Sequence, residues 1–282
     1  MALWFDEVYE DKIRFGLKIK RTLFSGRSPF QKVDVVETEA LGCALLLDEL
    51  WMTAEKIEKS YHEYIVHPTL TTAPSIERVL IIGGGDGGTA REVLRYPGVK
   101  SVQMVEIDGM VVQACKDHLP DPEAAWDDPR LEVIIGDGIK WVAEAAEKSY
   151  DVVIVDGSDP VGPAVGLFDR TFYANCARIL KPEGVFVSQA ESPTLLRDVH
   201  LEMLLALEES FQRVHPFYGT VSIYPGGAWG WVYASQSVDP LEILEERIAP
   251  IEAITEIYNR DIHRGAFAVP NHIRRGLEER RG

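Results

Sequence analysis

The stretch Arg78-Val-Leu-Ile-Ile-Gly-Gly-Gly-Asp-Gly-Gly88 decides the fold of this chain. Four apolar residues lead into six residues of which five are glycine, and residues 89–95, which have a helical composition, follow. This order predicts a buried parallel strand, a tight turn and the start of a helix. Gly83, Gly85 and Gly88 fit the G-x-G-x-x-G spacing of turns whose backbone N–H groups face a bound dinucleotide.

Asp86 separates this turn from ordinary dinucleotide sites. A carboxylate in the turn would repel a pyrophosphate, because like charges in a cleft oppose each other, whereas it attracts an ammonium group. The turn therefore predicts a nucleoside ligand that carries positive charge where NAD carries phosphates, and it argues against a NAD-linked dehydrogenase.

The composition is globular and strongly acidic. The chain has 282 residues, 46% of them hydrophobic and 26% charged, and a formal net charge of -16 at pH 7. This charge disfavours nucleic acid and anionic membranes and concentrates cationic small molecules, although it also serves solubility alone. Residues 1–7 are acidic where a signal peptide is basic, no apolar run approaches a membrane span, and the three cysteines show neither disulfide nor metal spacing. We expect a cytoplasmic protein.

The hydrophobic pattern divides the chain into two domains. In residues 1–66 it alternates with period two and then turns helical, which predicts a small antiparallel β domain with a connecting helix. Its expected strands are 13–20, 31–37, 43–47 and 50–53, with a turn at 25–29 and a helix at 56–67. Pro68 and Pro74 mark the passage into the second domain, residues 67–282.

From residue 77 near-continuous apolar strands alternate with amphipathic helices, a pattern typical of a parallel sheet covered on both faces. The expected strands are 78–82, 101–107, 131–135, 151–155 and 185–189, with two later strands, 213–218 and 230–235, at the far edge. The expected helices are 89–96, 109–118, 139–146, 169–180 and 194–211. The predicted fold class is α/β, with a Rossmann-like sheet of methyltransferase type, mostly parallel and seven-stranded.

The predicted carboxyl ends of the strands are unusually acidic. They carry the Asp86 turn, Glu106-Ile-Asp108, Gly136-Asp-Gly138, Asp156-Gly-Ser-Asp159 and Gln189-Ala-Glu191. Any single one is accounted for as turn or capping chemistry, but ligands bind at this edge of an α/β sheet, and five together favour a site. Glu106 suits the ribose hydroxyls and Asp137 the adenine amino group.

No polar group of the nucleoside is then left to pair with the carboxylates of Asp86, Asp156 and Asp159. Converging carboxylates need a counter-charge, and the seven histidines show no ligand spacing, so we expect an organic polycation and no metal. Residues 158–168 carry two prolines and two glycines, and we interpret them as a loop that covers the cleft as a lid; a purely structural connection would have the same composition.

Nine segments, in order, resemble those of the polyamine aminopropyltransferases, the spermidine synthase family. They are Phe30-Gln31, Tyr61-His-Glu63, Gly83–Gly88, Val105-Glu-Ile-Asp108, Gly136-Asp-Gly138, Asp156-x-x-Asp159-Pro, Gln189-x-Glu191, Tyr224-Pro-x-Gly227 and Ile262-His-Arg-x-Ala-Phe-x-x-Pro-Asn271. The resemblance implies transfer of an aminopropyl group from decarboxylated S-adenosylmethionine, a co-substrate rather than a recycled cofactor, to a diamine, releasing 5′-methylthioadenosine. It also implies a homodimer or homotetramer.

The resemblance assigns roles residue by residue. Asp156 would be the base that deprotonates the attacking amine, Tyr61 would orient the nitrogen, and Asp86 with Asp156 would hold the donor ammonium. The rest of the donor would contact Gln31, His62, Gly83, Gly85, Glu106, Asp137 and Gly138. The acceptor amine would contact Asp159, Gln189 and Tyr224.

The acceptor stays open at this point. Putrescine is the default, with cadaverine, agmatine and spermidine behind it, and the chain departs from the family pattern at Ile57, Gly157 and Thr194. A small residue at 194 would lengthen the pocket if its side chain faced it. An S-adenosylmethionine-dependent amine methyltransferase and a non-catalytic polyamine- or nucleoside-binding module are the rival interpretations.

Overall fold

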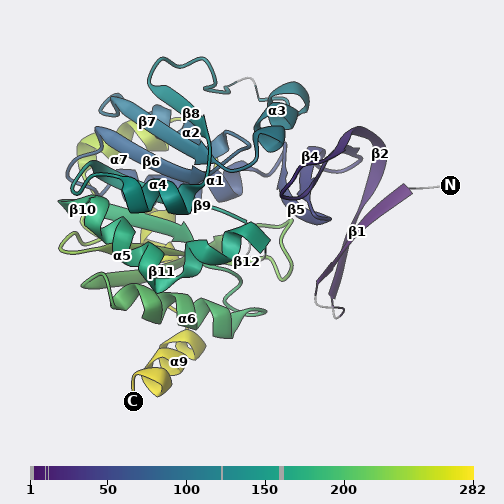
Figure 1. The fold of residues 1–282 in the computed structure, drawn as a ribbon. Coiled ribbons are helices and arrows are strands. Elements are labelled where there is room, and N and C mark those ends of the chain that lie inside the picture. The colour runs from purple at the N-terminus through teal and green to yellow at the C-terminus, as the bar shows by residue number, and fades with distance from the viewer. Residues whose placement is uncertain (1–2, 10, 12, 122, 159–161) are drawn as a thin grey trace.

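The structure, a computed structural model, describes residues 3–9, 11, 13–121, 123–158 and 162–282. Two sheets organise it: a five-stranded antiparallel sheet formed by the N-terminal residues and a seven-stranded, mostly parallel sheet formed by the rest. The small sheet stands beside the larger α/β part in Figure 1. The predicted fold class is confirmed.

The small sheet has the strand order β1-β2-β3-β4-β5. Its strands are β1 (Leu3–Tyr9), β2 (Ile13–Arg27), β3 (Lys32–Thr38), β4 (Gly42–Leu47) and β5 (Leu50–Ala54). The sequence analysis missed β1, and its turn at 25–29 was placed too early. Ser25, Gly26 and Arg27 pair with β3 and stay extended, because the cross-strand ladder overrides their turn propensity.

Helix α1 (Lys59–Leu70) links the two sheets, and it continues past Pro68, where a stop was expected. Ten of its twelve residues are buried, from Tyr61 to Leu70. A proline removes one helical N–H near the end of such a helix, and burial of the remaining turn compensates for that loss. The expected boundary between residues 66 and 67 therefore falls inside a continuous helix.

The large sheet has the order β11-β12-β10-β9-β6-β7-β8, with β12 antiparallel to both of its neighbours. Its strands are β6 (Arg78–Gly83), β7 (Ser101–Glu106), β8 (Leu131–Ile135), β9 (Tyr150–Asp156), β10 (Leu180–Gln189), β11 (Arg213–Thr220) and β12 (Ala228–Ser235). The predicted strands all correspond to these. The two later strands, β11 and β12, pair at one edge of the sheet as expected, and the structure shows that they pair antiparallel.

Helices cover both faces of this sheet because both faces of its strands are apolar. On β6, Val79 and Ile81 pack into one core with α1 and α2, whereas Leu80 and Ile82 pack into another with α4, α5 and α6. The helices are α2 (Gly88–Leu94), α3 (Gly109–His118), α4 (Gly138–Glu144), α5 (Arg170–Ile179) and α6 (Arg197–Glu208), close to the predicted spans.

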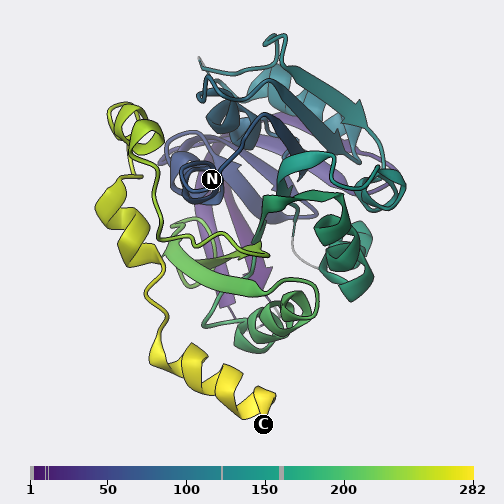
Figure 2. The same ribbon diagram turned by 90° about the vertical axis from the view of Figure 1, so that its left-hand side faces the viewer.

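Four helical segments were not predicted. A 3-10 helix covers Gly162–Phe168, inside the expected loop, and three helices follow the last strand: α7 (Glu245–Glu252), α8 (Arg260–Ala266) and α9 (Asn271–Arg281). The C-terminal helices run along the outside of the molecule, where α9 contacts α6 (Figure 2). They are short and highly charged, and each carries only one or two large apolar residues from which a helical period could be inferred.

Candidate active site

A cavity of about 260 Å³ lies between the small sheet and the carboxyl edge of the large sheet. Every predicted site residue that the structure describes lines it: Gln31, Tyr61, His62, Gly83, Gly85, Asp86, Glu106, Asp137, Gly138, Asp156, Gln189 and Tyr224. Asp159 lies outside the described residues. The structure thus brings together residues separated by almost two hundred positions.

The glycine turn brings β6 and β9 close together at the cavity. Gly83 has φ +83°, and a Cβ there would lie 2.1 Å from the carbonyl oxygen of Asp156. The next amide, that of Gly84, donates to that same oxygen at 2.9 Å. A glycine is therefore required for the conformation and for the contact that places Asp156 beside the turn.

Asp86 and Asp156 lie close together, and each carboxylate has its own hydrogen-bond partners. Asp86 accepts from the Gly88 amide at 2.9 Å, and its second oxygen lies 3.2 Å from His62 Nε2. Asp156 accepts from the Tyr61 hydroxyl at 2.8 Å and from the Thr89 hydroxyl at 2.6 Å. Both carboxylates are thereby oriented before any ligand binds.

The two aspartates differ in acidity. Burial and the charge of Asp86 raise the pKa of Asp156, against the charge of His62 and the hydrogen bonds from Thr89 and Tyr61. Burial also opposes ionisation of Asp86, but the charge and hydrogen bond of His62 outweigh it and lower the pKa of Asp86. Asp86 is thus the stronger acid of the pair, and Asp156 is a stronger base than a free aspartate.

His62, Asp86 and Asp156 offer ligand atoms that all lie within 4.8 Å of one another. A cation can be held there, and an organic ammonium fits as well as a metal ion does. His62 already lies within hydrogen-bonding distance of a carboxylate at each ring nitrogen, at Glu58 and at Asp86, so a metal ion would have to displace one of these contacts to bind the ring. This favours an ammonium group, which needs only the two carboxylates.

The cavity also has the polar groups expected for a ribose and a base. Glu106 is 8% exposed, and burial raises its pKa to about 7. Asp137 is exposed and caps α4, accepting from the amides of Ile139 and Lys140. Gln31 donates to Asp108 at 3.1 Å, which ties the loop after β2 to the end of β7.

The third part of the cavity is aromatic. Tyr224 donates to the Met52 carbonyl at 2.8 Å and packs against Tyr61 and Trp229, with ring centroids 5.9 and 4.5 Å away. Gln189 is 2% exposed and exchanges hydrogen bonds with Glu191. Aromatic faces with a few acceptors suit the methylene chain and ammonium ends of a polyamine.

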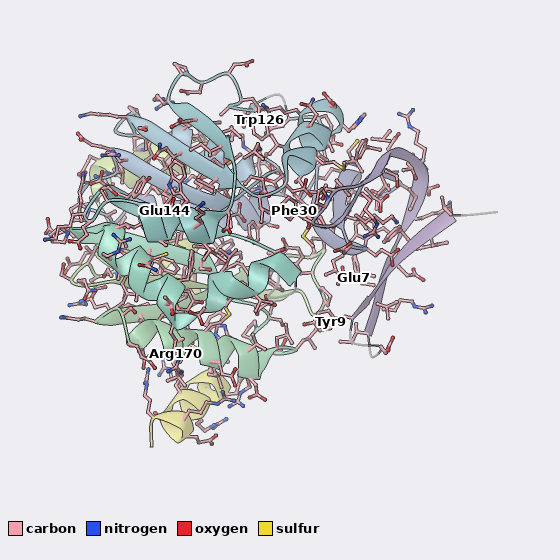
Figure 3. The ribbon with its side chains drawn as sticks, viewed as in Figure 1. Glu7, Tyr9, Phe30, Trp126, Glu144 and Arg170 are labelled. Carbon is pink, nitrogen blue, oxygen red and sulfur yellow. The ribbon has the colours of Figure 1, made fainter. Side chains whose placement is uncertain are left out.

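Glu7 and Tyr9 also line this cavity, and the sequence analysis missed them. They lie on β1, two residues apart and therefore on one face of the strand, and both carry labels in the region between the two sheets in Figure 3. Glu7 is 3% exposed and accepts from the Trp51 amide at 3.0 Å. Burial alternates along β1, but polar Glu7 faces inward while apolar Trp4 and Val8 face outward, so the sequence carries no period-two apolar signal for this strand.

The structure shows where Thr194 and the segment 158–168 lie relative to the cavity. Thr194 is exposed and does not line the cavity, so its small size does not lengthen the pocket; the neighbouring Leu195 lines it instead. Within the predicted loop at 158–168, Gly162–Phe168 form a 3-10 helix, from which Ala164 and Leu167 line the cavity. Its movement as a lid stays a prediction.

The large sheet, the glycine turn and the acidic cavity define a Rossmann-like α/β protein with a nucleoside-type site. Residues 58–242 match the family model of the spermine/spermidine synthase domain, and residues 3–55 match that of the spermidine synthase tetramerisation domain. The chain therefore belongs to the spermine/spermidine synthase family, and it is an enzyme of the polyamine aminopropyltransferase type.

Relatives match along nearly the whole chain. A polyamine aminopropyltransferase of Prochlorococcus marinus (strain MIT 9313) is 48% identical over 97% of this chain and 96% of its own length. One of Clostridium perfringens (strain SM101) is 40% identical over 99% of both. A solved spermidine synthase in complex with the transition state analogue AdoDATO superimposes with a TM-score of 0.95 at 34% identity, covering 98% of this chain and 95% of that one. The spermidine synthase of Thermotoga maritima gives 0.94 at 33%, covering 99% and 95%.

Among the described residues, no helix combines the length and apolarity needed to cross a membrane.

Proposed function

We propose that this enzyme transfers an aminopropyl group from decarboxylated S-adenosylmethionine to putrescine, giving spermidine and 5′-methylthioadenosine. The observation that carries the proposal is the pair of adjacent carboxylates, Asp86 and Asp156, beside a glycine turn that suits a nucleoside. A donor with a sulfonium and a primary ammonium supplies the positive charge that such a pair needs. The transition state analogue held by the related spermidine synthase supports the same donor.

In the proposed mechanism, the acceptor nitrogen attacks the methylene carbon bonded to the donor sulfur. The new C–N bond takes the nitrogen lone pair, the C–S bond breaks, and its electrons neutralise the sulfonium to a thioether. The leaving group needs no acid. The amine is protonated at neutral pH, so Asp156 accepts its proton, and Tyr61, bonded to the same carboxylate at 2.8 Å, orients the nitrogen.

The proposed donor site extends along the edge of the large sheet. Asp86 with Asp156 holds the ammonium, Glu106 accepts from the ribose hydroxyls and Asp137 accepts from the adenine amino group. Gln31, His62, Gly83, Gly85 and Gly138 complete it. Asp86 also selects the donor, because ordinary S-adenosylmethionine would place its carboxylate against this aspartate.

We propose that the acceptor contacts Gln189, Tyr224 and Asp159, of which Asp159 follows β9 in the sequence and lies outside the described residues. The same reaction could instead use a different amine as its preferred acceptor, namely cadaverine, agmatine or spermidine. Glu7, a buried carboxylate at the aromatic part of the cavity, is the residue best placed to distinguish them by binding a distal ammonium.

An acceptor panel tests the proposal. The purified protein is incubated with decarboxylated S-adenosylmethionine and each of putrescine, cadaverine, agmatine and spermidine, and the thioether nucleoside and amine product are measured by mass. We expect putrescine to give the highest kcat/KM. Turnover only with ordinary S-adenosylmethionine would assign the chain to methyl transfer, and binding without turnover in every pair would indicate a non-catalytic module.

We propose a cytoplasmic homodimer or homotetramer that associates through the small sheet. Strand β1 is an edge strand, and Leu3, Trp4 and Val8 are 57%, 58% and 46% exposed on it. Exposed edges with large apolar side chains are typical of surfaces covered by another chain. Light scattering on Trp4→Glu against the wild type tests this: a shift to a smaller species supports it, and an unchanged mass contradicts it.

A further inference from the structure

Glu58 lies immediately before α1, and its side chain does not cap that helix. Instead the carboxylate reaches one turn along the helix to accept from His62 Nδ1 at 2.6 Å. The same oxygen accepts from Arg91 Nη2 at 2.7 Å. The side chain is 14% exposed, so this is a partly buried and doubly paired carboxylate that does not line the cavity.

The other ring nitrogen of His62 faces the site. Nε2 lies 3.2 Å from Asp86 Oδ2, and the ring is 3% exposed. A Cβ at position 88 would lie 2.3 Å from His62 Cε1, so Gly88 leaves the space that the imidazole fills. The ring also packs edge-on against Tyr61. These contacts fix both the position and the tilt of the imidazole.

The flanking groups decide the protonation of this ring. A neutral imidazole has one nitrogen lone pair, and in either tautomer that lone pair would point at a carboxylate, Glu58 or Asp86. Only the imidazolium donates to both. The charged groups around it are Glu58 and Asp86 at its nitrogens, Asp156 across the cavity, and Arg91 behind Glu58; Tyr61 is the titratable neighbour on α1.

Arg91 holds Glu58 in place from α2. Its guanidinium is 5% exposed and also donates to Glu92 at 2.8 Å and to Asp121 at 2.6 Å. A buried carboxylate with a fixed guanidinium partner has little freedom to rotate away. The chain Arg91–Glu58–His62–Asp86 therefore runs from the interior of the helical layer to the wall of the cavity.

We propose that Glu58 is a positioning residue: it keeps His62 an imidazolium that donates to Asp86, and the positive charge of His62 allows Asp86 and Asp156 to be ionised side by side. This rests on the proposed function, in which Asp156 must be ionised to accept a proton. Without Glu58, His62 loses its charge more readily, and the uncompensated Asp86 opposes ionisation of Asp156.

The acidities agree with this geometry. Burial would lower the pKa of His62, but the charges and hydrogen bonds of Asp86 and Glu58 raise it well above its usual value. Burial would raise the pKa of Glu58, and His62 and Arg91 together hold it below its usual value. Both shifts favour the charged forms of the two groups.

The test is the acidic limb of kcat/KM for the donor against pH, which reports the free enzyme. Glu58→Gln keeps the size and removes the charge. We expect it to move this limb to higher pH by about 0.5 to 1 unit, so that activity falls roughly three- to tenfold below the limb and less than about threefold above it. Glu58→Asp retains the charge, and we expect its acidic limb to lie close to that of the wild type.

Glu92→Gln is the matched control. Glu92 is a buried carboxylate bonded to the same Arg91, but it is paired with His67 rather than His62. We expect it to lower the melting temperature and leave the limb in place. A limb that moves equally in Glu92→Gln and Glu58→Gln would overturn the proposal, because it would then reflect general loosening.

A second comparison removes dependence on one variant. His62→Gln is expected to move the limb in the same direction, and the double variant Glu58→Gln/His62→Gln no further, because Glu58 acts through His62. Additive shifts would overturn the inference. If the wild type transfers no aminopropyl group, both the proposed function and this inference are overturned. If the wild type is active but the acidic limb does not move in the variants, only the inference is overturned.

Discussion

Asp156 and Asp86 have different environments although they lie side by side. Asp156 is bonded to two neutral hydroxyls and has a raised pKa, whereas Asp86 faces a cationic imidazole and has a lowered one. A base for an ammonium group needs affinity for a proton, and an anchor for an ammonium group needs to keep its charge. The two environments suit these two tasks.

Replacing Asp156 by asparagine removes the proposed base. We expect kcat, measured by product formation, to fall about 10²- to 10⁴-fold. Donor binding, measured by calorimetry, should weaken less than kcat, because Asp86 still holds the ammonium. Asp151→Asn is the control, since Asp151 lies on the same strand but pairs with Lys181 away from the cavity. It should lower stability and leave kcat within roughly threefold. An active Asp156→Asn enzyme would assign proton removal to another group or to solvent.

Replacing Asp86 by asparagine tests donor selection. The variant keeps an acceptor for the Gly88 amide but has no charge to attract an ammonium or to repel a carboxylate. The preference for decarboxylated over ordinary S-adenosylmethionine is expected to fall about tenfold or more, which corresponds to roughly 1.4 kcal/mol. Titration calorimetry with both nucleosides measures this, and an equal loss for both would argue against selection by charge.

Glu106 links stability to pH. Its folded pKa of about 7 lies above its ordinary value of 4.5, so the folded state holds a proton that the unfolded state releases between these values. Stability contributed by this group is therefore lost as pH rises through that window, by up to about 3 kcal/mol.

Glu106→Gln removes this dependence. We expect the variant to melt higher than the wild type at pH 8 and with little difference at pH 4.5. Donor binding should weaken, because an amide NH2 replaces one of the two oxygens that accept from the ribose hydroxyls. Calorimetric melts at the two pH values measure the first effect. A melting difference that does not change with pH would show that Glu106 titrates normally.

At the scale of elements, two glycines of the turn allow α1 and β9 to pack closely against it, because glycine has no side chain. Gly88 leaves room for the His62 ring, and Gly83 leaves room for the Asp156 carbonyl. Helix α1 thus places Tyr61 beside Asp156 and His62 beside Asp86. The two sheets meet at this point, so the helix that joins them also builds the site.

Gly83→Ala should disrupt this arrangement. Alanine at φ +83° is strained, and its Cβ would lie 2.1 Å from backbone that cannot move without separating β6 from β9. We expect a loss of about 2 to 4 kcal/mol and a fall in melting temperature of about 5 °C or more. Gly98→Ala is the control, because its Cβ would meet only Ile76 at 3.4 Å. Equal melting temperatures for the two variants would contradict the expectation.

At the scale of the whole molecule, the net charge of -16 gives a field that attracts both proposed substrates, which are cations. Salt screens this attraction, with a Debye length that falls from about 10 Å at 0.1 M to about 3 Å at 1 M. We expect kcat/KM for putrescine to fall about threefold or more between 0.05 and 0.5 M NaCl, with kcat changed less.

Sucrose at the same osmolality is the control for this measurement, since it adds solute without ions. Steady-state rates across the two series separate the effects. A kcat/KM that is insensitive to salt would mean that local carboxylates, rather than the overall charge, attract the acceptor.

The sequence by itself determined the large sheet, its helices and the main acidic residues at its carboxyl edge. The reason is local: apolar strands, amphipathic helices and a glycine turn each carry their signal within a few residues, and parallel strands must end at one edge. Asp86, Glu106 and Asp156 were found because that edge is where an α/β sheet binds ligands.

Only the tertiary structure decided what packs against those residues. It placed Glu7 and Tyr9 of β1 in the cavity, kept β2 extended through Arg27, and joined Glu58 to Asp86 through His62. These features depend on contacts between segments far apart along the chain, and no pattern within one segment records its partner. The charge of His62 follows from that packing, because two carboxylates, one local and one from the glycine turn, flank the same ring.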